Sequence, residues 1–253
     1  MGKTKFRGAI CALIAPLLGP FQTTAATAAD DFARERRQMA AEIAAMAAAT
    51  KAETGRERFA ESVMQAMANV PRHRFVAESL SRSAYRNEPL PIGAGQTISQ
   101  PYIVALSTDL IDPRPEHVVL EIGTGSGYQA AVLSELVKEV YSIEIVEALG
   151  QAAATRLETL GYRNVLVRVG DGYQGWPEHA PFDGIIVTAA APFIPEPLIA
   201  QLKSGGKMAI PVDAADGSQD MLLVEKRADG TIEKRTVLRV RFVPMTGKGV
   251  QRR

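Results

Sequence analysis

A short run of glycines directly after a predicted strand is the feature of this sequence best suited to hold a ligand. The strand ends at Ile122, Gly123, Gly125 and Gly127 occupy every second position after it, and a helix-prone segment begins at Tyr128. Glycine lets the backbone approach a ligand closely, and the first turn of a helix presents free N–H groups. The Gly-x-Gly-x-Gly spacing departs from the Gly-x-Gly-x-x-Gly of dinucleotide sites, and tight packing turns use glycine in the same way. The turn indicates a close backbone approach without identifying the ligand.

Carboxylates at the ends of successive predicted strands narrow the kind of ligand. Glu121 lies next to the end of the first strand, Glu144 near the end of the second, and Asp171 follows the third. In an open α/β sheet these ends border the crevice where ligands bind, and an acidic side chain there accepts hydrogen bonds from both ribose hydroxyls. We therefore expect a nucleoside site with Glu144 on the ribose. The alternative for Glu144 is a solvated strand-end residue, since Glu147 is close by.

The elements that would position these residues alternate along the second half of the chain. Strand-like runs occupy residues 117–122, 140–145, 165–169, 184–189 and 208–212, and helical runs occupy 128–137, 148–160 and 195–202. Strands that alternate with helices predict an α/β fold with a mainly parallel sheet covered on both faces. Residues 221–226 and 236–243, joined through Asp229-Gly230, predict a C-terminal antiparallel hairpin.

The first half of the chain predicts an N-terminal extension of helices and loops. Residues 31–67 are rich in Ala, Glu, Arg and Met and predict two helices broken near Gly55. Pro71 and its predecessor resist the helical conformation and end this region. Residues 81–101 contain several prolines and glycines and predict a loop-rich stretch.

The first 28 residues differ from the rest and predict a cleavable export signal. Three basic residues lie within the first seven positions, an apolar run covers residues 9–18, and Ala26-Thr27-Ala28 offers the small residues that signal peptidase requires. The apolar run is about half the length needed to span a bilayer, so we expect no stable membrane insertion after cleavage. A functional signal predicts a periplasmic or secreted protein.

Composition argues against several other chemistries. Loss of residues 1–28 removes three positive charges and no negative ones, which changes the formal net charge from +1 to −2, and it removes Cys11, the only cysteine. No thiol then remains for a disulfide or a metal, and His73, His117 and His179 show no ligand spacing, so we expect no metal. The near-neutral charge and the lack of a Lys/Arg-rich tract give no reason to expect nucleic acid as partner. A monomer is expected.

The end of the chain separates two classes of nucleoside site. Five parallel strands closed by an antiparallel hairpin resemble the Class I methyltransferase fold rather than a six-stranded nicotinamide-dinucleotide domain. A closer resemblance covers residues 60–246, through the blocks at 70–76, 90–93, 95–102, 119–127, 170–176, 181–190, 202–206 and 240–245. On these blocks the chain resembles the protein-L-isoaspartate O-methyltransferase family, for which the Gln-Thr-Ile-Ser-Gln-Pro of residues 96–101 is close to diagnostic.

The resemblance implies a fold, an activity and site residues. It implies methyl esterification of L-isoaspartyl and D-aspartyl residues in damaged proteins, which initiates their repair, with S-adenosyl-L-methionine as methyl donor. Residues 31–115 would supply N-terminal helices and an acceptor-side loop, and residues 116–253 the donor-binding core of the same structural unit. Ser99 matches the family's active-site serine. The cofactor-binding residues expected from the turn, the strand ends and the resemblance together are Thr97, Ile98, Glu121, Gly123, Gly125, Ser126, Gly127, Glu144, Asp171, Gly172, Thr246 and Gln251.

The chemistry implied by the resemblance needs no strong base. An isoaspartyl carboxylate is already ionised at neutral pH, so the protein has to position it and to remove water from it. We therefore assign Ser99 to orienting the acceptor carboxylate by a hydrogen bond and not to covalent attack.

Two other functions are compatible with the sequence. One is a Class I methyltransferase with a small-molecule acceptor, and the other is a non-catalytic envelope protein that keeps the fold and holds damaged peptides. The export signal favours the second, because S-adenosylmethionine is made in the cytoplasm and an exported enzyme would lack an evident donor supply. The family usually acts in the cytoplasm, and this chain would stay there if the signal were not functional. The segment around Glu144 also departs from the bacterial family, since it reads Ser-Ile-Glu-Ile-Val-Glu in place of Val-Glu-Arg-Ile.

Overall fold

The computed structural model describes residues 1–2 and 32–251. Phe32–Arg253 form one compact unit, separate from Met1–Asp31. The predicted export signal therefore lies, apart from its first two residues, outside the described part of the chain. No helix among the described residues is long and apolar enough to cross a membrane.

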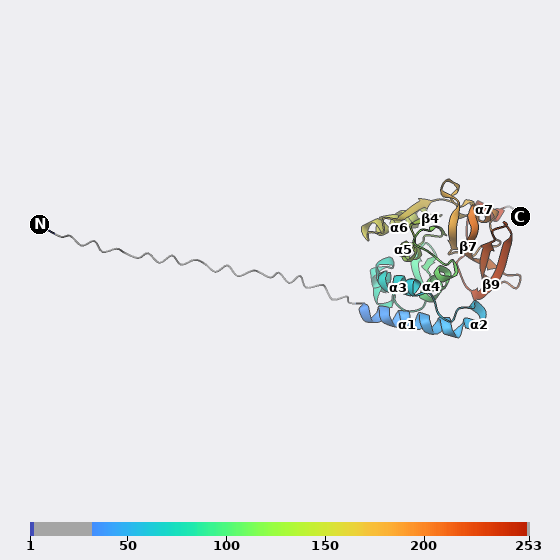
Figure 1. Ribbon diagram of the computed structural model, residues 1–253. Coiled ribbons are helices and arrows are strands. Elements are labelled where there is room, and N and C mark those ends of the chain that lie inside the picture. Colours follow the sequence, from blue (N-terminus) through green and yellow to red (C-terminus); the bar gives the residue numbers. More distant parts are fainter. Residues whose placement is uncertain (3–31, 252–253) are drawn as a thin grey trace. The chain divides into compact units, whose positions relative to one another are not determined.

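A seven-stranded sheet forms the centre of the compact unit (Figure 1). Its strands are β3 (Val118–Ile122), β4 (Glu139–Glu144), β5 (Val165–Val169), β6 (Phe182–Val187), β7 (Leu202–Asp213), β8 (Gln219–Lys226) and β9 (Ile232–Val240). They follow the order β5-β4-β3-β6-β7-β8-β9, in which the first five are parallel and β8 and β9 are antiparallel. The predicted parallel sheet with a closing hairpin is confirmed.

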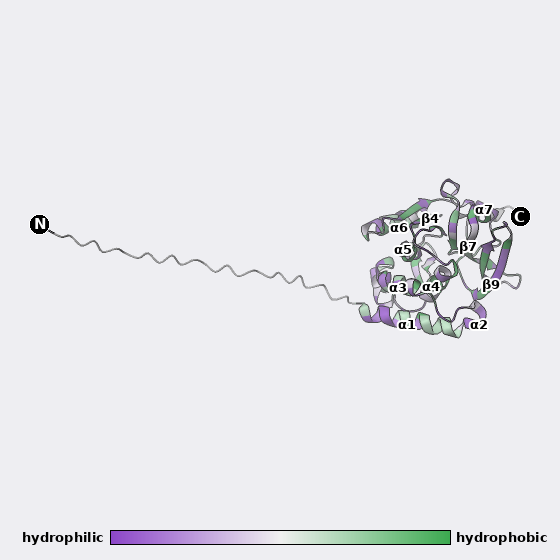
Figure 2. Cartoon of the chain, viewed as in Figure 1, coloured by the Kyte–Doolittle hydropathy of each residue, from purple (hydrophilic) through white to green (hydrophobic). Residues whose placement is uncertain are grey.

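Alternate residues of the parallel strands supply two separate hydrophobic cores. On β3, Val119 joins the core that contains the N-terminal helices, and Leu120 joins the opposite one. On β6, Ile186 and Ile185 divide in the same way. Side chains alternate across a strand, so a continuous apolar run is what a strand buried on both faces requires. Figure 2 shows hydrophobic residues in the inner strands of the sheet, whereas β9 and α1 (Ala33–Ala49) mix both kinds.

Helices cover the sheet and build the N-terminal extension. They are α2 (Lys51–Thr54), α3 (Glu61–Asn69), α4 (Pro101–Leu110), α5 (Tyr128–Ser134), α6 (Glu147–Thr159) and α7 (Glu196–Gln201), with short 3₁₀ turns η1 (Arg72–Phe75), η2 (Glu78–Ser83), η3 (Gly172–Gln174), η4 (Pro177–His179) and η5 (Lys248–Gln251). The predicted break at Gly55 is confirmed, because this residue has φ 71° and caps α2 in the left-handed conformation. α1 buries Met39, Ile43 and Ala47 against the extension.

The stretch predicted as loop contains regular structure. β1 (Leu90–Gly93) and β2 (Gln96–Ile98) form an antiparallel pair that turns at Ala94 and Gly95, both with positive φ. α4 begins at Pro101, since the fixed φ of proline suits the first position of a helix. β7 also begins at Leu202, earlier than the predicted residue 208, and directly continues α7.

Candidate active site

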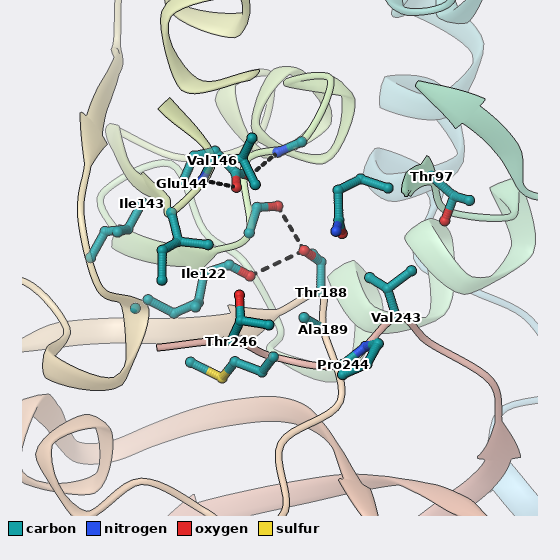
Figure 3. Close-up of a pocket in the computed structure, with 16 residues that line it drawn as sticks. Thr97, Ile122, Ile143, Glu144, Val146, Thr188, Ala189, Val243, Pro244 and Thr246 are labelled. Atoms are coloured by element: carbon teal, nitrogen blue, oxygen red, sulfur yellow. Dashed lines mark hydrogen bonds between the residues drawn. The ribbon is translucent and has the colours of Figure 1, made fainter. Parts of the chain in front are cut away.

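A cavity of about 560 Å³, including its open mouth, lies where β3, β4 and β6 end. We call it the donor cavity. Figure 3 shows Ile122, Ile143 and Glu144 on one side of it, Thr97 on the other, and the segment from Val243 to Thr246 along its floor. Its remaining lining residues are Gln96, Gly123, Gly125, Ile145, Val146, Gly172, Thr188 and Ala189. The cavity occupies the position that the strand-end rule predicts for a ligand in an open α/β sheet.

The glycine turn brings backbone to the wall of the donor cavity. Gly123 has φ 96°, and a Cβ at this position would overlap the Oγ1 of Thr188. The Thr188 hydroxyl donates toward the carbonyl oxygens of Gly123 and Ile122, at 2.7 and 3.1 Å (Figure 3). Only glycine combines this backbone conformation with this close approach.

Glu144 is held rigidly at the end of β4. Its Oε2 accepts a hydrogen bond from the backbone N–H of Gly125 at 2.7 Å, and its Oε1 accepts one from the N–H of Val146 at 2.9 Å. Only 5% of the surface of Glu144 is exposed to solvent, so the alternative of a solvated strand-end residue is wrong. Each carboxylate oxygen can accept a further bond, which leaves both oxygens able to bind hydroxyl groups in the cavity.

Glu121 lies deeper than Glu144 and is fully buried. Its Oε2 accepts a short hydrogen bond from the Oγ of Ser142. Its Oε1 makes no hydrogen bond of ordinary geometry with the described residues, although the N–H of Ala130 faces the carboxyl. Burial, with a smaller contribution from the negative charge of Glu144, raises the pKa of Glu121 to about 8.

A smaller cavity of about 280 Å³ connects Glu121 to the predicted active-site serine. Thr97, Gly123 and Thr188 border both this cavity and the donor cavity. Ser99 borders the smaller cavity and also borders a groove of about 920 Å³, including its open mouth. We call these spaces the transfer cavity and the acceptor groove. The groove is lined by Met46, Pro89, Thr97, Ser99, Gln100, Tyr102, Ile103, Leu238, Arg239, Val240, Arg241 and Phe242.

A buried arginine positions the backbone at Ser99. Arg72 is fully buried, and its Nη2 donates to the carbonyl oxygen of Ser99 at 2.7 Å while its Nε donates to that of Ala84, also at 2.7 Å. Its guanidinium lies over the ring of Tyr128, 4.8 Å from the centroid, and burial lowers the pKa of Arg72 to about 10. The hydroxyl of Ser99 has no hydrogen-bond partner in the described part of the protein, so it can donate to a ligand.

The C-terminal tail, residues 243–251, lines the donor cavity and donates a backbone hydrogen bond to the carboxylate of Asp171. Ala190 donates to the carbonyl of Val243 at 2.8 Å, and Met245 donates back to Ala190 at 2.7 Å, which fixes the tail beside the end of β6. Asp171 accepts from the backbone N–H groups of Tyr173 at 3.0 Å and Lys248 at 2.9 Å. Asp171 therefore anchors the tail with its Oδ2, while its Oδ1 caps the 3₁₀ turn η3.

The predicted site residues divide by location. Those that line the donor cavity are Thr97, Gly123, Gly125, Glu144, Gly172 and Thr246, and those that line the transfer cavity without reaching the donor cavity are Ile98, Ser99, Glu121 and Ser126. Gly127 and Asp171 line neither, and Gly127 instead packs against Leu157 of α6, where a Cβ would lie 3.2 Å from that side chain. The side chain of Gln251 lies outside the described structure.

The structure also adds residues that sequence reasoning missed. Thr188 and Ala189 follow β6 directly, so the strand-end rule that selected Glu144 could have selected them. Within the described residues, no group of three or more His, Cys, Asp or Glu side chains could hold a metal ion.

Fold and site together define a Class I methyltransferase: five parallel strands, an antiparallel closing hairpin, a glycine turn and a buried carboxylate at the end of β4. The family described as protein-L-isoaspartate(D-aspartate) O-methyltransferase (PCMT) matches residues 49–250. The chain belongs to this family.

Individual relatives agree with the family match. Protein-L-isoaspartate O-methyltransferase 1 of Cupriavidus necator is 59% identical over 223 residues, which are 88% of this chain and 86% of that protein. Protein-L-isoaspartate O-methyltransferase 2 of Polaromonas sp. is 59% identical over 83% of this chain and 100% of its own length. A solved protein-L-isoaspartate O-methyltransferase aligns with a TM-score of 0.74 and 29% identity, covering 84% of this chain and 66% of that one. A Plasmodium falciparum structure named for the same family, in complex with S-adenosyl-L-homocysteine, aligns with a TM-score of 0.64 and 25% identity, covering 74% of this chain and 91% of that one.

Proposed function

We propose that this chain methylates the side-chain carboxylate of L-isoaspartyl residues in damaged proteins, with S-adenosyl-L-methionine as donor, and so initiates their repair. The observation that carries the proposal is the continuity of three spaces at residues 97–99. Thr97 borders the donor cavity, the transfer cavity and the acceptor groove, and Ser99 borders the last two. Relatives 59% identical to this chain are named for the same activity.

The residues of the donor cavity suit an adenosine-containing sulfonium. Glu144 keeps free acceptor capacity for ribose hydroxyls. At Gly123 and Gly172 the backbone lies so close to Thr188 and Ile122 that a Cβ would clash, and both glycines line the cavity. The carboxyl of Glu121 borders the transfer cavity. When bound, the donor supplies a methyl group that its positive charge already activates. The protein then has to hold the acceptor carboxylate in line and exclude water.

The acceptor groove favours a peptide over a small molecule. It is open to solvent and its lining runs from Met46 on α1 across residues 97–103 to residues 238–242 after and within β9. Arg239 and Arg241 both line it, and Arg239 is paired with Asp216, which leaves Arg241 as the lining cation with no ion pair to a described carboxylate. A lining that spans several elements can hold an extended peptide, whereas a small molecule would contact only part of it.

Methylation of paired peptides tests the proposed acceptor. The purified protein, incubated with methyl-labelled S-adenosylmethionine, is expected to label an isoaspartyl peptide at least about tenfold faster than its aspartyl counterpart, because the normal carboxylate stands one methylene away from the position at Ser99. Equal labelling of both peptides would contradict the isoaspartyl proposal. Calorimetry with the donor alone provides the control. If the protein binds the donor but labels neither peptide, it remains a methyltransferase by class and the isoaspartyl residue is not its acceptor.

We also propose that residues 1–28 are an export signal and that the mature protein is periplasmic or secreted. The basic start, the apolar run and the small residues at 26–28 support this. Expressed in a Gram-negative host, the protein is expected in the periplasmic fraction with Ala29 or Asp30 as its first residue. Amino-terminal sequencing that finds Met1 on cytoplasmic protein would contradict the proposal, and a copy that lacks residues 2–28 serves as the cytoplasmic reference.

A further inference from the structure

We propose that Glu121 holds a proton in the free protein and releases it when the sulfonium donor binds, so that this carboxyl distinguishes the donor from its demethylated product. The inference rests on the proposed methyl donor and is independent of the acceptor. It assigns to Glu121 a role in ligand selection beyond lining the site.

The surroundings of Glu121 disfavour a negative charge in the free protein. The side chain has no exposed surface and one oxygen accepts from Ser142. The other makes no hydrogen bond of ordinary geometry with the described residues, although the backbone N–H of Ala130 faces the carboxyl and opposes the rise in its pKa by a smaller amount than burial causes. A buried carboxylate is stable only when a cation or several donors compensate it. Burial accordingly raises the pKa of Glu121 to about 8, so the carboxyl is mainly protonated at neutral pH.

The charged and titratable groups around Glu121 do not supply a compensating cation. On β4, Ser142 is neutral and Glu144 is negative, and Glu144 adds to the rise in the pKa of Glu121. On α5, Tyr128 also borders the transfer cavity, and burial raises the pKa of its phenol, so it stays neutral. The remaining residues that border the cavity are uncharged, among them Val104 of α4, Thr188 after β6, Thr97 and Ile98 of β2, and Ser99 of the loop before α4. Arg72, the one Arg or Lys among the buried residues described, lies over the ring of Tyr128 and does not border the cavity.

The transfer cavity is where a bound positive charge would meet Glu121. It joins the donor cavity, through Thr97, Gly123 and Thr188, to Ser99 on the acceptor side. A methyl group that passes from donor to acceptor has to cross this space, so the sulfur that carries it has to face the space as well. A cation in a buried cavity lowers the pKa of an adjacent carboxyl.

Proton release makes donor affinity depend on pH in a defined direction. Below the pKa of free Glu121, the donor can bind the carboxylate form only by displacing a proton, so its affinity rises with pH, by up to about tenfold per unit. The rise ends above the pKa of about 8. The product has a neutral sulfur and does not stabilise the carboxylate, so its affinity stays level through the same range. The ratio of donor to product affinity therefore increases with pH.

Calorimetry in two buffers measures the proposed proton directly. Titrations of the intact protein with S-adenosylmethionine and with S-adenosylhomocysteine are run at pH 7 in phosphate and in Tris, whose different ionisation enthalpies report proton exchange. We expect about 0.5–1 proton released per donor bound and about none per product bound. In Glu121→Gln, whose neutral amide resembles the protonated acid, both ligands should bind without proton release.

A second buried carboxyl offers a matched control. Asp109 on α4 is also buried, burial raises its pKa, and it is bonded to Ala60 and Arg56 outside the three cavities. Asp109→Asn should keep the proton release of the unmodified protein. The pH dependence of the two affinities in the unmodified protein tests the same inference without a variant, should Glu121→Gln fail to fold.

Three results would overturn the inference. Equal proton release with both ligands would assign the effect to the ammonium group that donor and product share. Proton release that persists in folded Glu121→Gln would show that another residue loses the proton. No proton release in the unmodified protein would contradict the inference directly. Failure to bind either ligand would contradict the proposed function itself, so the two failures are distinguishable.

Discussion

Replacement of Glu144 by alanine is expected to weaken donor binding by about 2–4 kcal/mol, which is roughly a 30- to 1,000-fold rise in Kd. Two losses add in this variant. The ribose loses its charged acceptor, and the backbone N–H groups of Gly125 and Val146 lose the oxygens that fix the turn, at 2.7 and 2.9 Å. Calorimetry with S-adenosylhomocysteine is the suitable measurement, because it needs no acceptor.

Glu147→Ala is the matched control for this result. Glu147 begins α6, its carboxylate is exposed, and it accepts from Gln151 on the same helix. It removes the same charge three residues away without touching the glycine turn, so donor affinity should change less than about threefold. An unchanged Kd in Glu144→Ala would refute the assignment of this carboxylate to the donor.

The parts of the fold that the sequence predicts are those whose pattern is local. The inner strands β3, β4 and β6 appear as apolar runs because they are buried on both faces, as Val119 and Leu120 illustrate by joining opposite cores. The hairpin of β8 and β9 carries its own turn signal at Asp229-Gly230. By contrast, α4 begins at Pro101, and proline marks a helix start as readily as a loop.

In the candidate site, too, the residues that the sequence predicts correctly are those with a local pattern. Glu144 and the glycines at 123 and 125 follow from the rule that strand ends face the ligand. Asp171 satisfies the same rule, yet one of its oxygens binds the backbone of a tail more than seventy residues away, which no local pattern contains. Its other oxygen binds the N–H of Tyr173. The order of Glu121 and Glu144 in depth is likewise a tertiary property, because it depends on Ser142 and on the helices that cover β3.

Ser99→Ala is expected to lower turnover on isoaspartyl peptides by about ten- to a thousandfold, equivalent to about 1.4–4 kcal/mol of transition-state stabilisation. The backbone of Ser99 is fixed independently of its side chain, because Arg72 donates to its carbonyl oxygen. Its hydroxyl is free of partners within the described protein and borders both the transfer cavity and the acceptor groove. The substitution therefore removes a donor to the acceptor carboxylate and leaves the loop in place.

The accompanying measurements separate this role from a structural one. Donor affinity and thermal stability of Ser99→Ala should match those of Ser62→Ala, a change at an exposed serine on α3. Mass spectrometry during turnover should find no covalent methyl-enzyme or acyl-enzyme, since the hydroxyl orients and does not attack. Ser99→Thr keeps a hydroxyl and should retain more activity than Ser99→Ala. Full activity in Ser99→Ala would mean that other hydrogen-bond donors orient the acceptor carboxylate. A covalent adduct at Ser99 would mean that Ser99 acts as a nucleophile and not as a positioning residue.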